Sequence, residues 1–252
     1  MKYYGISDRG SVREENQDCC AAHKFAENAY LFLVCDGMGG ENGGKIASAT
    51  CASVFEKQMR RRLARYLDSK NIPTKVQKDI PRYLEDSLAH ANSELYEMAN
   101  SNPNLSGMGT TLVALFVLGQ KAFIINVGDS RAYFYAAGNI MQITKDHSYV
   151  QFLIDSGRIT KEEAGHHPQK NVIIRSVGVS ESVVPDIFEL DMIEGDTFLL
   201  CSDGLSNFVT ESRIVKCISG NDDNEMRIRS LIDSVKLVSG TDNITALIAE
   251  NI

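Results

Sequence analysis

Four aspartates in this sequence each stand at one end of an apolar run and within two residues of a glycine: Asp36, Asp129, Asp203 and Asp242. This pattern is typical of acids that β-strands carry to the rim of a sheet. An ionised carboxyl group in such a place is costly unless a positive charge meets it. Carboxylate oxygens are also the ligands that hard divalent cations prefer. The pattern therefore predicts one cation site shared by the four aspartates.

The polar segment 13–18 precedes the first strongly apolar run and contains Arg13 and Asp18. One interpretation is an exposed, charged turn. The other is part of a phosphate site, because a guanidinium group can hold a phosphate through two hydrogen bonds while a carboxylate binds the metal that neutralises it. Neither residue decides between these interpretations on its own.

Length and composition limit the classes of protein to consider. The chain has 252 residues, 43% of them hydrophobic, and we expect one domain over 1–252. A net charge of −7 argues against nucleic-acid binding, which favours basic domains. The first residues lack the apolar core of a signal peptide, and the longest apolar run, 112–118, is too short to cross a bilayer. We therefore expect a cytoplasmic protein without a membrane span.

The cysteines indicate a reducing environment. No CxxC pair occurs, and most of the cysteines lie inside apolar runs, so small buried thiols are favoured over disulfides or zinc ligands. The six positions are Cys19, Cys20, Cys35, Cys51, Cys201 and Cys217.

Two long helices are expected at 43–67 and 80–100, because apolar residues recur in both at spacings of three and four. Residues 67–79 interrupt this pattern and match no motif. The far end of the first helix is basic, with Lys57, Arg60, Arg61, Arg62 and Arg65. Such an end usually complements the helix dipole, and docking of an acidic partner is the alternative.

The middle of the chain is expected to form an antiparallel meander, because glycine-containing turns too short for parallel crossovers separate four strands: 110–118, 121–127, 131–136 and 140–143. A helix at 149–155, a capping box beginning at Thr160 and a polar stretch follow, which we interpret as a flap at about 148–175. That stretch contains His166 and His167. Adjacent side chains diverge on any regular element, so surface polarity is favoured over metal binding for this pair.

Strands at 197–202 and 244–249 and helices at 210–219 and 224–239 complete the chain. There is no internal repeat and no low-complexity tract. In this order of elements, pairs of helices alternate with runs of strands. The order predicts an α+β fold with helices outside and antiparallel sheets inside.

Seven motifs, in order along almost the whole chain, resemble those of the metal-dependent Ser/Thr protein phosphatases of type 2C, the PPM family. They are Arg-x-x-Asn-Gln-Asp at 13–18, Asp-Gly-Met-Gly-Gly at 36–40, Gly-Met-Gly-Thr-Thr at 107–111, Asn-Val-Gly-Asp-Ser-Arg at 126–131, Asp-His-Ser at 146–148, Cys-Ser-Asp-Gly-Leu at 201–205 and Asp-Asn-Ile-Thr at 242–245. The chain is most similar to the compact bacterial branch. This resemblance implies a four-layer α-β-β-α sandwich, with two central antiparallel sheets flanked by helix pairs.

The resemblance also implies a dinuclear Mn²⁺ or Mg²⁺ centre at one end of the sandwich. Carried over by position, Asp36 bridges both ions and the Gly37 carbonyl binds one of them. Asp203 and Asp242 complete the other side. These oxygen ligands suit hard divalent cations and exclude a cysteine-rich zinc site.

Three further positions carry implied roles near this centre. Asp18 lies at the second ion, directly or through water, and Arg13 holds the phosphoryl oxygens. Asp129 matches a position that helps to hold a third, weaker ion in bacterial members. The chain departs from many relatives at Met38, where eukaryotic members often have a histidine, and at Gln17, where many have glutamate. The proton donor for the leaving group is therefore unassigned.

The implied reaction is hydrolysis of phosphoserine and phosphothreonine in proteins. Two such cations lower the pKa of a water between them, so that hydroxide attacks phosphorus in line with the leaving oxygen and no phosphoenzyme forms. The ions and Arg13 stabilise charge on the phosphoryl oxygens. Expected partners are phosphorylated Ser/Thr proteins and a Ser/Thr kinase whose action the enzyme reverses. The enzyme is expected to be a monomer.

Other functions are less compatible with the sequence or share the same fold class. Residues 39–45 satisfy the GxxxxGK pattern of a P-loop nucleotide hydrolase, but Ile46 replaces the hydroxyl residue that holds Mg²⁺. A cysteine-based phosphatase needs an arginine six positions after its cysteine, and no cysteine here has one. A phosphatase-like regulatory module without turnover would be expected to lose metal ligands. A switch phosphatase acting on a phosphorylated anti-sigma antagonist shares the fold class and differs only in its substrate.

Overall fold

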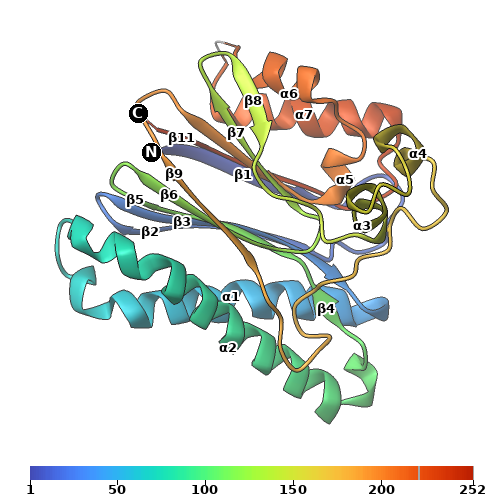
Figure 1. The fold of residues 1–252 in the computed structure, drawn as a ribbon, viewed down its shortest axis with the longest axis horizontal. Coiled ribbons are helices and arrows are strands. Elements are labelled where there is room, and N and C mark those ends of the chain that lie inside the picture. The colour runs from blue at the N-terminus through green and yellow to red at the C-terminus, as the bar shows by residue number, and fades with distance from the viewer. Residues whose placement is uncertain (221, 252) are drawn as a thin grey trace.

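The computed structural model describes residues 1–220 and 222–251 and has four layers (Figure 1). Two antiparallel sheets stack in the middle. Helices α1 (Gly40–Leu67) and α2 (Ile80–Ser101) cover the outer face of one sheet, and α6 (Glu211–Ile218) and α7 (Asn224–Val238) cover the other. The expected α-β-β-α sandwich, with two antiparallel sheets flanked by helix pairs, is therefore confirmed.

The first sheet joins the two ends of the chain. Its strand order is β1 (Lys2–Asp8), β11 (Ile244–Glu250), β10 (Thr197–Cys201), β7 (Arg131–Ala136) and β8 (Asn139–Gln142). Strands β1 and β11 are antiparallel, with Asp8 opposite Ile244. The segment that follows Asp8 and the segment that precedes Ile244 therefore lie side by side at one end of the sheet.

The second sheet carries the first of the predicted site aspartates. Its order is β2 (Asp18–Ala26), β3 (Ala29–Met38), β5 (Leu112–Leu118), β6 (Lys121–Val127) and β9 (Asp186–Asp191), and the short β4 (Gly109–Thr110) pairs with the end of β3. Asp18 is directly opposite Asp36 in the β2–β3 pairing. Two carboxyl groups are thus neighbours on adjacent strands.

Strand β3 is apolar from Ala29 to Cys35, and both of its faces are buried there. Leu31 and Leu33 belong to the cluster that packs against α1 and α2, whereas Phe32 and Val34 belong to the cluster between the two sheets. A third cluster packs α6 and α7 against the first sheet. These apolar layers hold the strands in place, so that polar residues at the strand ends are positioned by the core behind them.

The predicted helices are confirmed and the predicted strands are incomplete. Helix α1 begins at Gly40, three residues before the expected start. Strands β1, β2 and β9 have no counterpart in the sequence-based expectation, because none is fully buried and their sequences carry polar residues. The expected strand at 110–118 is divided at Thr111 into β4 and β5.

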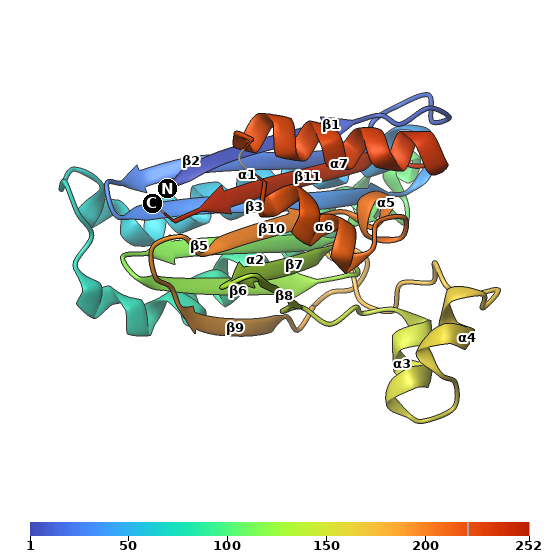
Figure 2. The ribbon, with the colours of Figure 1, turned by 90° about the horizontal axis from the view of Figure 1, so that it is seen from above.

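The segment predicted as a flap contains two short helices, α3 (Tyr149–Asp155) and α4 (Lys161–Gly165), and projects beyond the sheets (Figure 2). The capping box is confirmed, since Thr160 Oγ1 accepts from the Glu163 amide and the Glu163 carboxylate accepts from the Thr160 amide. His166 is exposed and His167 accepts a hydrogen bond from the Gln169 amide through Nδ1. Mobility of the segment stays a prediction.

Three smaller expectations concern cysteines, the linker and membranes. All six cysteines are free, and Cys35, Cys51 and Cys201 are fully buried while the others are partly exposed. The segment 67–79 includes a 3-10 helix (Thr74–Asp79) whose Val76 is buried. Among the described residues, no helix combines the length and apolar character that crossing a bilayer requires.

Candidate active site

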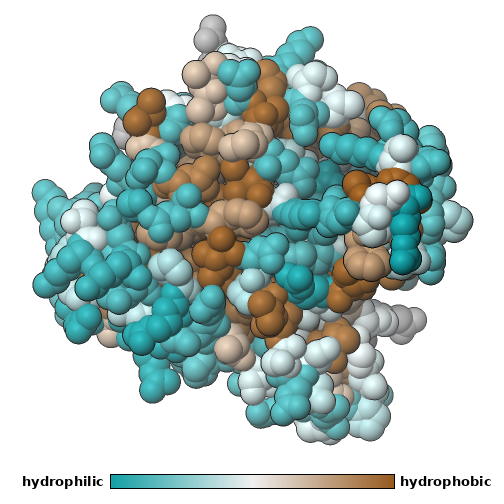
Figure 3. All heavy atoms as spheres, viewed as in Figure 1, coloured by the Kyte–Doolittle hydropathy of each residue, from teal (hydrophilic) through white to brown (hydrophobic). Residues whose placement is uncertain are grey.

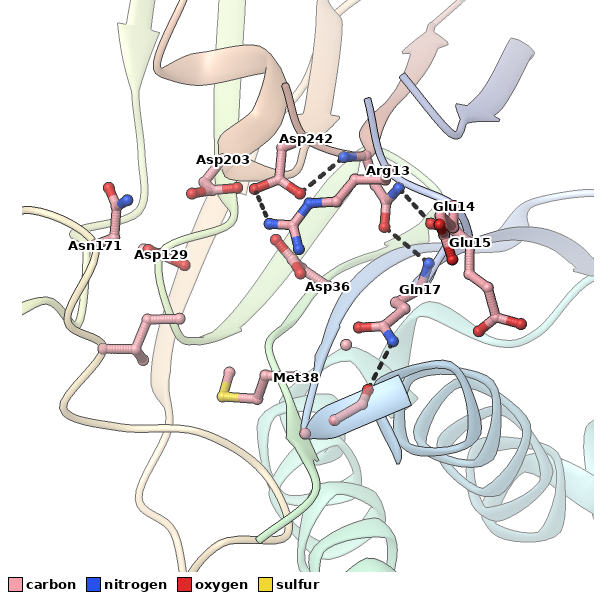
Figure 4. Close-up of a pocket in the computed structure, with 15 residues that line it drawn as sticks. Arg13, Glu14, Glu15, Gln17, Asp36, Met38, Asp129, Asn171, Asp203 and Asp242 are labelled. Atoms are coloured by element: carbon pink, nitrogen blue, oxygen red, sulfur yellow. Dashed lines mark hydrogen bonds and ion pairs between the residues drawn. The ribbon is translucent and has the colours of Figure 1, made fainter. Parts of the chain in front are cut away.

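A cavity of about 970 Å³ opens where the ends of both sheets meet. Most of the residues expected to do chemistry line it, Gly37 among them. Figure 4 shows the side chains of the others pointing into the same space: Arg13, Asp36, Asp129, Asp203 and Asp242. Segments from near both ends of the chain and from its middle thus form one site.

Both sheets deliver the aspartates. Asp36 lies near the end of β3 and Asp129 in the turn between β6 and β7. Asp203 is the first residue of α5 (Asp203–Ser206), immediately after β10, and Asp242 lies two residues before β11. The prediction that strand ends bring these acids together is consistent with their shared cavity.

The two threonines after Gly109 hold the backbone of Asp36. The Asp36 amide donates to Thr111 Oγ1 (2.9 Å), and Thr110 Oγ1 donates to the Asp36 carbonyl (2.8 Å). Thr111 Oγ1 also lies 2.7 Å from Ser130 Oγ, beside Asp129. These hydroxyl groups leave the Asp36 carboxylate free to face the cavity, and they explain why the polar motif at 107–111 interrupts an apolar strand.

Two glycines in the site permit contacts that any side chain would block. A Cβ atom on Gly37 would lie 2.0 Å from the Gly44 carbonyl oxygen, because the turn after Asp36 packs against the first turn of α1. A Cβ atom on Gly204 would lie 1.9 Å from the Asn243 carbonyl oxygen. Each glycine therefore allows the backbone beside an aspartate to approach a second segment of the site.

Arg13 lies over the cavity and pairs with one of its aspartates. Its Nη2 atom is 3.0 Å from Asp242 Oδ2, and both side chains are partly exposed. Figure 4 shows the guanidinium group between Asp242 and Asp36. The phosphate-site interpretation of segment 13–18 requires such a cation beside the cavity.

Asn243 ties the loop that carries Arg13 to the Asp242 turn. Its side-chain oxygen accepts from the Gln17 amide (2.8 Å), and its Nδ2 donates to the carbonyls of Arg9 and Glu15 (2.9 Å each). Asn243 is buried. The motif at 242–245 contains Asn243, but the sequence alone does not reveal its role, because its partners lie near the other end of the chain.

Asp18 is the one predicted ligand that does not line the cavity. Its Oδ2 atom accepts hydrogen bonds from Ser202 Oγ (2.8 Å) and Thr245 Oγ1 (2.6 Å). Asp18 therefore lies behind Asp36 and joins the second sheet to the two strands of the first sheet that carry Asp203 and Asp242.

A second ion pair supports the Asp129 turn. Arg131 binds both carboxylate oxygens of Asp146, at 2.9 and 2.7 Å. The next residue, His147, accepts from the Gly128 amide through Nδ1 (3.0 Å) and donates its own amide to the Gly128 carbonyl (2.9 Å). The Asp-His-Ser motif thus positions the turn, which sequence analysis did not foresee.

Burial makes the carboxylate cluster electrostatically costly. It raises the pKa of Asp36 well above the ordinary value, and Asp18 and Asp203 raise that pKa further. Burial likewise raises the pKa of Asp129 to about 7, with Asp203 adding to the effect. The pKa of Asp18 is raised to about 6 by burial, although its two hydroxyl partners oppose the shift. Cations that bind among these acids would stabilise their ionised forms and so lower the raised pKa values.

The donor atoms fit hard divalent cations. The acidic lining supplies only oxygen donors, and Asp129 Oδ1 is buried without a hydrogen-bond partner among the described residues. Over residues 1–220 and 222–251, which the structure describes, no three acidic, histidine or cysteine side chains are already arranged to hold an ion. Asp242 is paired with Arg13 instead. Ion binding by these carboxylates would therefore require their side chains to reorient and the Arg13–Asp242 pair to open.

The backbone at 39–45 does not fit the P-loop alternative. Helix α1 begins at Gly40, so this segment is helical and forms no open loop that could wrap around phosphates. The carboxylates of the same cavity would also repel a nucleotide's phosphates.

Comparisons with known proteins agree with the geometry. The family model "Protein phosphatase 2C" matches residues 9–224. The chain is 34% identical over 244 residues to a serine/threonine phosphatase, stp, of Listeria welshimeri, covering 97% of this chain and 93% of that protein.

Solved structures show the same fold. The Mycobacterium tuberculosis serine/threonine phosphatase PstP matches with a TM-score of 0.85 and 34% identity over 99% of this chain and 98% of that chain. A structure of the PstP catalytic domain with two manganese ions matches with a TM-score of 0.83 and 31% identity, over 99% and 97% of the two chains. Site, sequence and fold agree: the chain belongs to the protein phosphatase 2C family and is a bacterial-type member of it.

Proposed function

We propose how this cavity carries out the activity that its family membership gives the chain, metal-dependent hydrolysis of phosphoserine and phosphothreonine in proteins. The observation that carries the proposal is the convergence of four aspartates from both sheets on one open cavity, with Arg13 above them. The family's dinuclear Mn²⁺ or Mg²⁺ centre supplies an activated water and neutralises charge on the phosphoryl group.

Three aspartates and one carbonyl hold the two ions in this proposal. Asp36 would hold ions from near the end of β3, where its carboxyl group lines the cavity. The Gly37 carbonyl assists Asp36 on one side, and Asp203 and Asp242 bind on the other. All four residues line the cavity.

Two further aspartates act at the margins of this centre. Asp18 supports the second ion from behind Asp36, where its hydroxyl partners on Ser202 and Thr245 hold the carboxylate in place. Asp129, whose buried Oδ1 has no hydrogen-bond partner among the described residues, would help to hold a third, weaker ion.

Arg13 binds the phosphoryl oxygens of the substrate. Its ion pair with Asp242 is partly exposed and therefore weakly held, so a phosphate dianion can replace the carboxylate as its partner. The exchange leaves Asp242 free to bind an ion. Asn243 keeps the Arg13 loop beside Asp242 during this exchange.

The leaving oxygen takes its proton from water. Met38 lies on the cavity wall at the position where a histidine donor would stand, and a thioether has no proton to give. The described lining contains no histidine. The pH–rate profile should accordingly contain no fall in rate at high pH that Met38→Leu removes or shifts.

We propose that the physiological substrates are proteins that a Ser/Thr kinase has phosphorylated, so that the chain reverses the action of that kinase. We also propose that the chain works as a monomer. A regulatory module without turnover is not favoured, because every aspartate implied by the resemblance is present and all but Asp18 line the cavity.

The test uses a phosphothreonine peptide, purified protein and Mn²⁺, followed by excess chelator, with ATP as a competing substrate. We expect phosphate release from the peptide that stops with chelator and is absent in Asp36→Asn. Turnover of ATP without turnover of peptide would contradict the proposal, as would a well-folded protein that hydrolyses neither.

A further inference from the structure

We propose that the chain has a second phosphate-recognition site, remote from the active site, that captures another phosphorylated residue of the same substrate protein. This inference rests on the proposed function. A surface cavity of about 490 Å³ lies between the end of α1 and the start of α2. This cavity, here called the arginine cavity, is lined by Arg61, Arg62, Ala64, Arg65, Arg82 and Tyr83.

The arginine cavity concentrates positive charge that the fold does not balance. Arg62 pairs with Asp86 at 3.0 Å, but Arg61, Arg65 and Arg82 form no ion pair with any residue that the structure describes. The whole chain carries a net charge of −7, so this cluster is not part of a generally basic surface. Figure 3 shows one face of the molecule, on which hydrophilic residues cover much of the surface. Guanidinium groups without a carboxylate partner remain able to form charge-assisted hydrogen bonds with a bound anion.

Aromatic rings and a carboxylate hold several of these side chains in place. The Arg65 guanidinium lies 4.7 Å from the centre of the Tyr66 ring and that of Arg82 lies 5.7 Å from the centre of the Tyr83 ring. Asp86 orients Arg62, whose buried Nε has no hydrogen-bond partner among the described residues. Guanidinium groups that are already oriented lose less conformational entropy when they bind a ligand.

The chemistry of the arginine cavity favours a phosphate monoester. A phosphate dianion offers three oxygens, and each can accept from a different guanidinium group or from both nitrogens of one. A carboxylate has one charge and two acceptor oxygens, so it satisfies fewer of the four arginines. The expected occupant is therefore a phosphoserine or phosphothreonine side chain, the same chemistry that the active site hydrolyses.

The distance between the two cavities sets the spacing of the two phosphates. Gly40, at the start of α1, lines the active site, and Arg61 lies near the far end of the same helix. At the helical rise of about 1.5 Å per residue, their separation along the axis is roughly 30 Å. Figures 1 and 2 show the α1–α2 connection at the opposite end of the molecule from α3, α4 and α5. An extended peptide needs roughly ten residues or more to reach from one cavity to the other.

Direct binding tests the site without any turnover. The Arg13→Ala/Asp36→Asn protein in excess chelator, in which the active site can no longer hold phosphate through Arg13, is titrated into a fluorescent peptide with one phosphoserine, into its unphosphorylated form and into its aspartate form, with inorganic phosphate as competitor. We expect the phosphopeptide to bind at least tenfold more tightly than the other two, and Arg61→Ala/Arg65→Ala to abolish that preference. The control Lys2→Ala/Lys216→Ala removes two exposed lysines outside the cavity and should change affinity less than twofold. Equal loss in both double variants, or binding that ignores the phosphate, would overturn the proposal.

Kinetics then test the spacing. Peptides carry one phosphothreonine and a phosphonate that cannot be hydrolysed, placed either too close to reach the second cavity or well beyond the roughly ten residues that an extended chain needs. With Mn²⁺, we expect the long spacing to lower KM about tenfold relative to a singly phosphorylated peptide, and this gain to vanish in Arg61→Ala/Arg65→Ala with kcat unchanged. The same KM for both spacings would contradict the proposed site. Failure to hydrolyse any peptide would instead contradict the proposed function, and the binding result would still stand.

Discussion

The two ends of α1 lie beside cavities of opposite charge that are assembled in different ways. At its start, aspartates from both sheets converge, and burial raises the pKa of Asp129 to about 7. At its far end, four arginines from two adjacent helices line a shallower cavity, and three of them are exposed. The acidic cavity depends on the whole fold, whereas the basic one depends on a single helical hairpin.

This difference predicts how each cavity responds to change. Buried like charges are stabilised by ions of opposite charge and destabilised when they are forced to ionise. Exposed like charges are screened by salt and cost little. Perturbing the acidic cavity should therefore alter catalysis and stability together, and perturbing the arginine cavity should alter binding alone.

The largest effect is expected from Asp36→Asn, which should lower kcat by about a thousandfold or more, because it removes the bridging carboxylate. The backbone of Asp36 is held by Thr110 and Thr111, so the fold should persist. Steady-state kinetics with Mn²⁺ and circular dichroism check both statements. Asp191→Asn, an exposed acid on β9, is the control and should stay within twofold of the wild type. A near-normal rate in Asp36→Asn would remove Asp36 from the metal site.

Metal-free stability should fall as pH rises from about 4 to 7. The pKa of Asp129 is about 7 in the folded chain and that of Asp18 about 6, both above the ordinary value of 3.8. In this window the folded chain binds more protons than the unfolded chain, so the free energy of unfolding decreases with pH, by an amount on the order of a few kcal/mol. Thermal melts in chelator measure the trend.

Added Mn²⁺ should reverse this loss of stability, and Asp129→Asn should flatten the pH dependence in chelator. If the free energy of unfolding of the metal-free protein instead rises with pH between about 4 and 7, the carboxylates are stabilised by positive partners and do not repel one another as the account requires. The arginine cavity provides the contrast, since Arg61→Ala/Arg65→Ala should leave the slope unchanged.

Asn243→Ala should cost about 2 kcal/mol of unfolding free energy, because two carbonyls and one amide lose a buried partner. It should also raise KM more than it lowers kcat, since the Arg13 loop is no longer held beside Asp242. Denaturant unfolding and steady-state kinetics separate these effects. Asn139→Ala, an exposed asparagine in β8, is the matched control. Unchanged KM would mean that the loop keeps its place without Asn243.

The smallest effect is expected from Arg13→Ala. It should raise KM for a phosphopeptide by about tenfold, because binding common to the ground and transition states is removed. Its ion pair with Asp242 is partly exposed, so stability should change by less than about 1 kcal/mol. Arg13→Lys should restore KM only in part, because an ammonium group cannot hold two oxygens in one plane. An unchanged KM in Arg13→Ala would remove Arg13 from the phosphate site.

Local sequence patterns are sufficient to predict the long helices and the acids at the strand ends, but not the short helix α5 that begins at Asp203. The glycine beside each aspartate and the apolar run before or after it are local signals, so Asp36, Asp129, Asp203 and Asp242 could be grouped without a structure. The periodic helices α1 and α2 were predictable for the same reason.

Features that depend on distant partners were not predictable in this way. Strands β1 and β9 are polar or half-buried and become strands because β11 and β6 pair with them. Asn243 and Asp146 act through residues far along the chain or through a turn whose shape the sequence does not reveal. The sequence shows the basic end of α1 but not the arginine cavity, because Arg82 of α2 joins that end only when the two helices pack.

The most direct test of the central claim is one Mn²⁺ titration of the chelator-treated protein, in which bound ions and phosphate released from a phosphothreonine peptide are measured together. The account predicts no release without ions, release that rises as two ions bind, and loss of that release in Asp36→Asn. Full turnover in excess chelator, or turnover in Asp36→Asn at the wild-type rate, would contradict it.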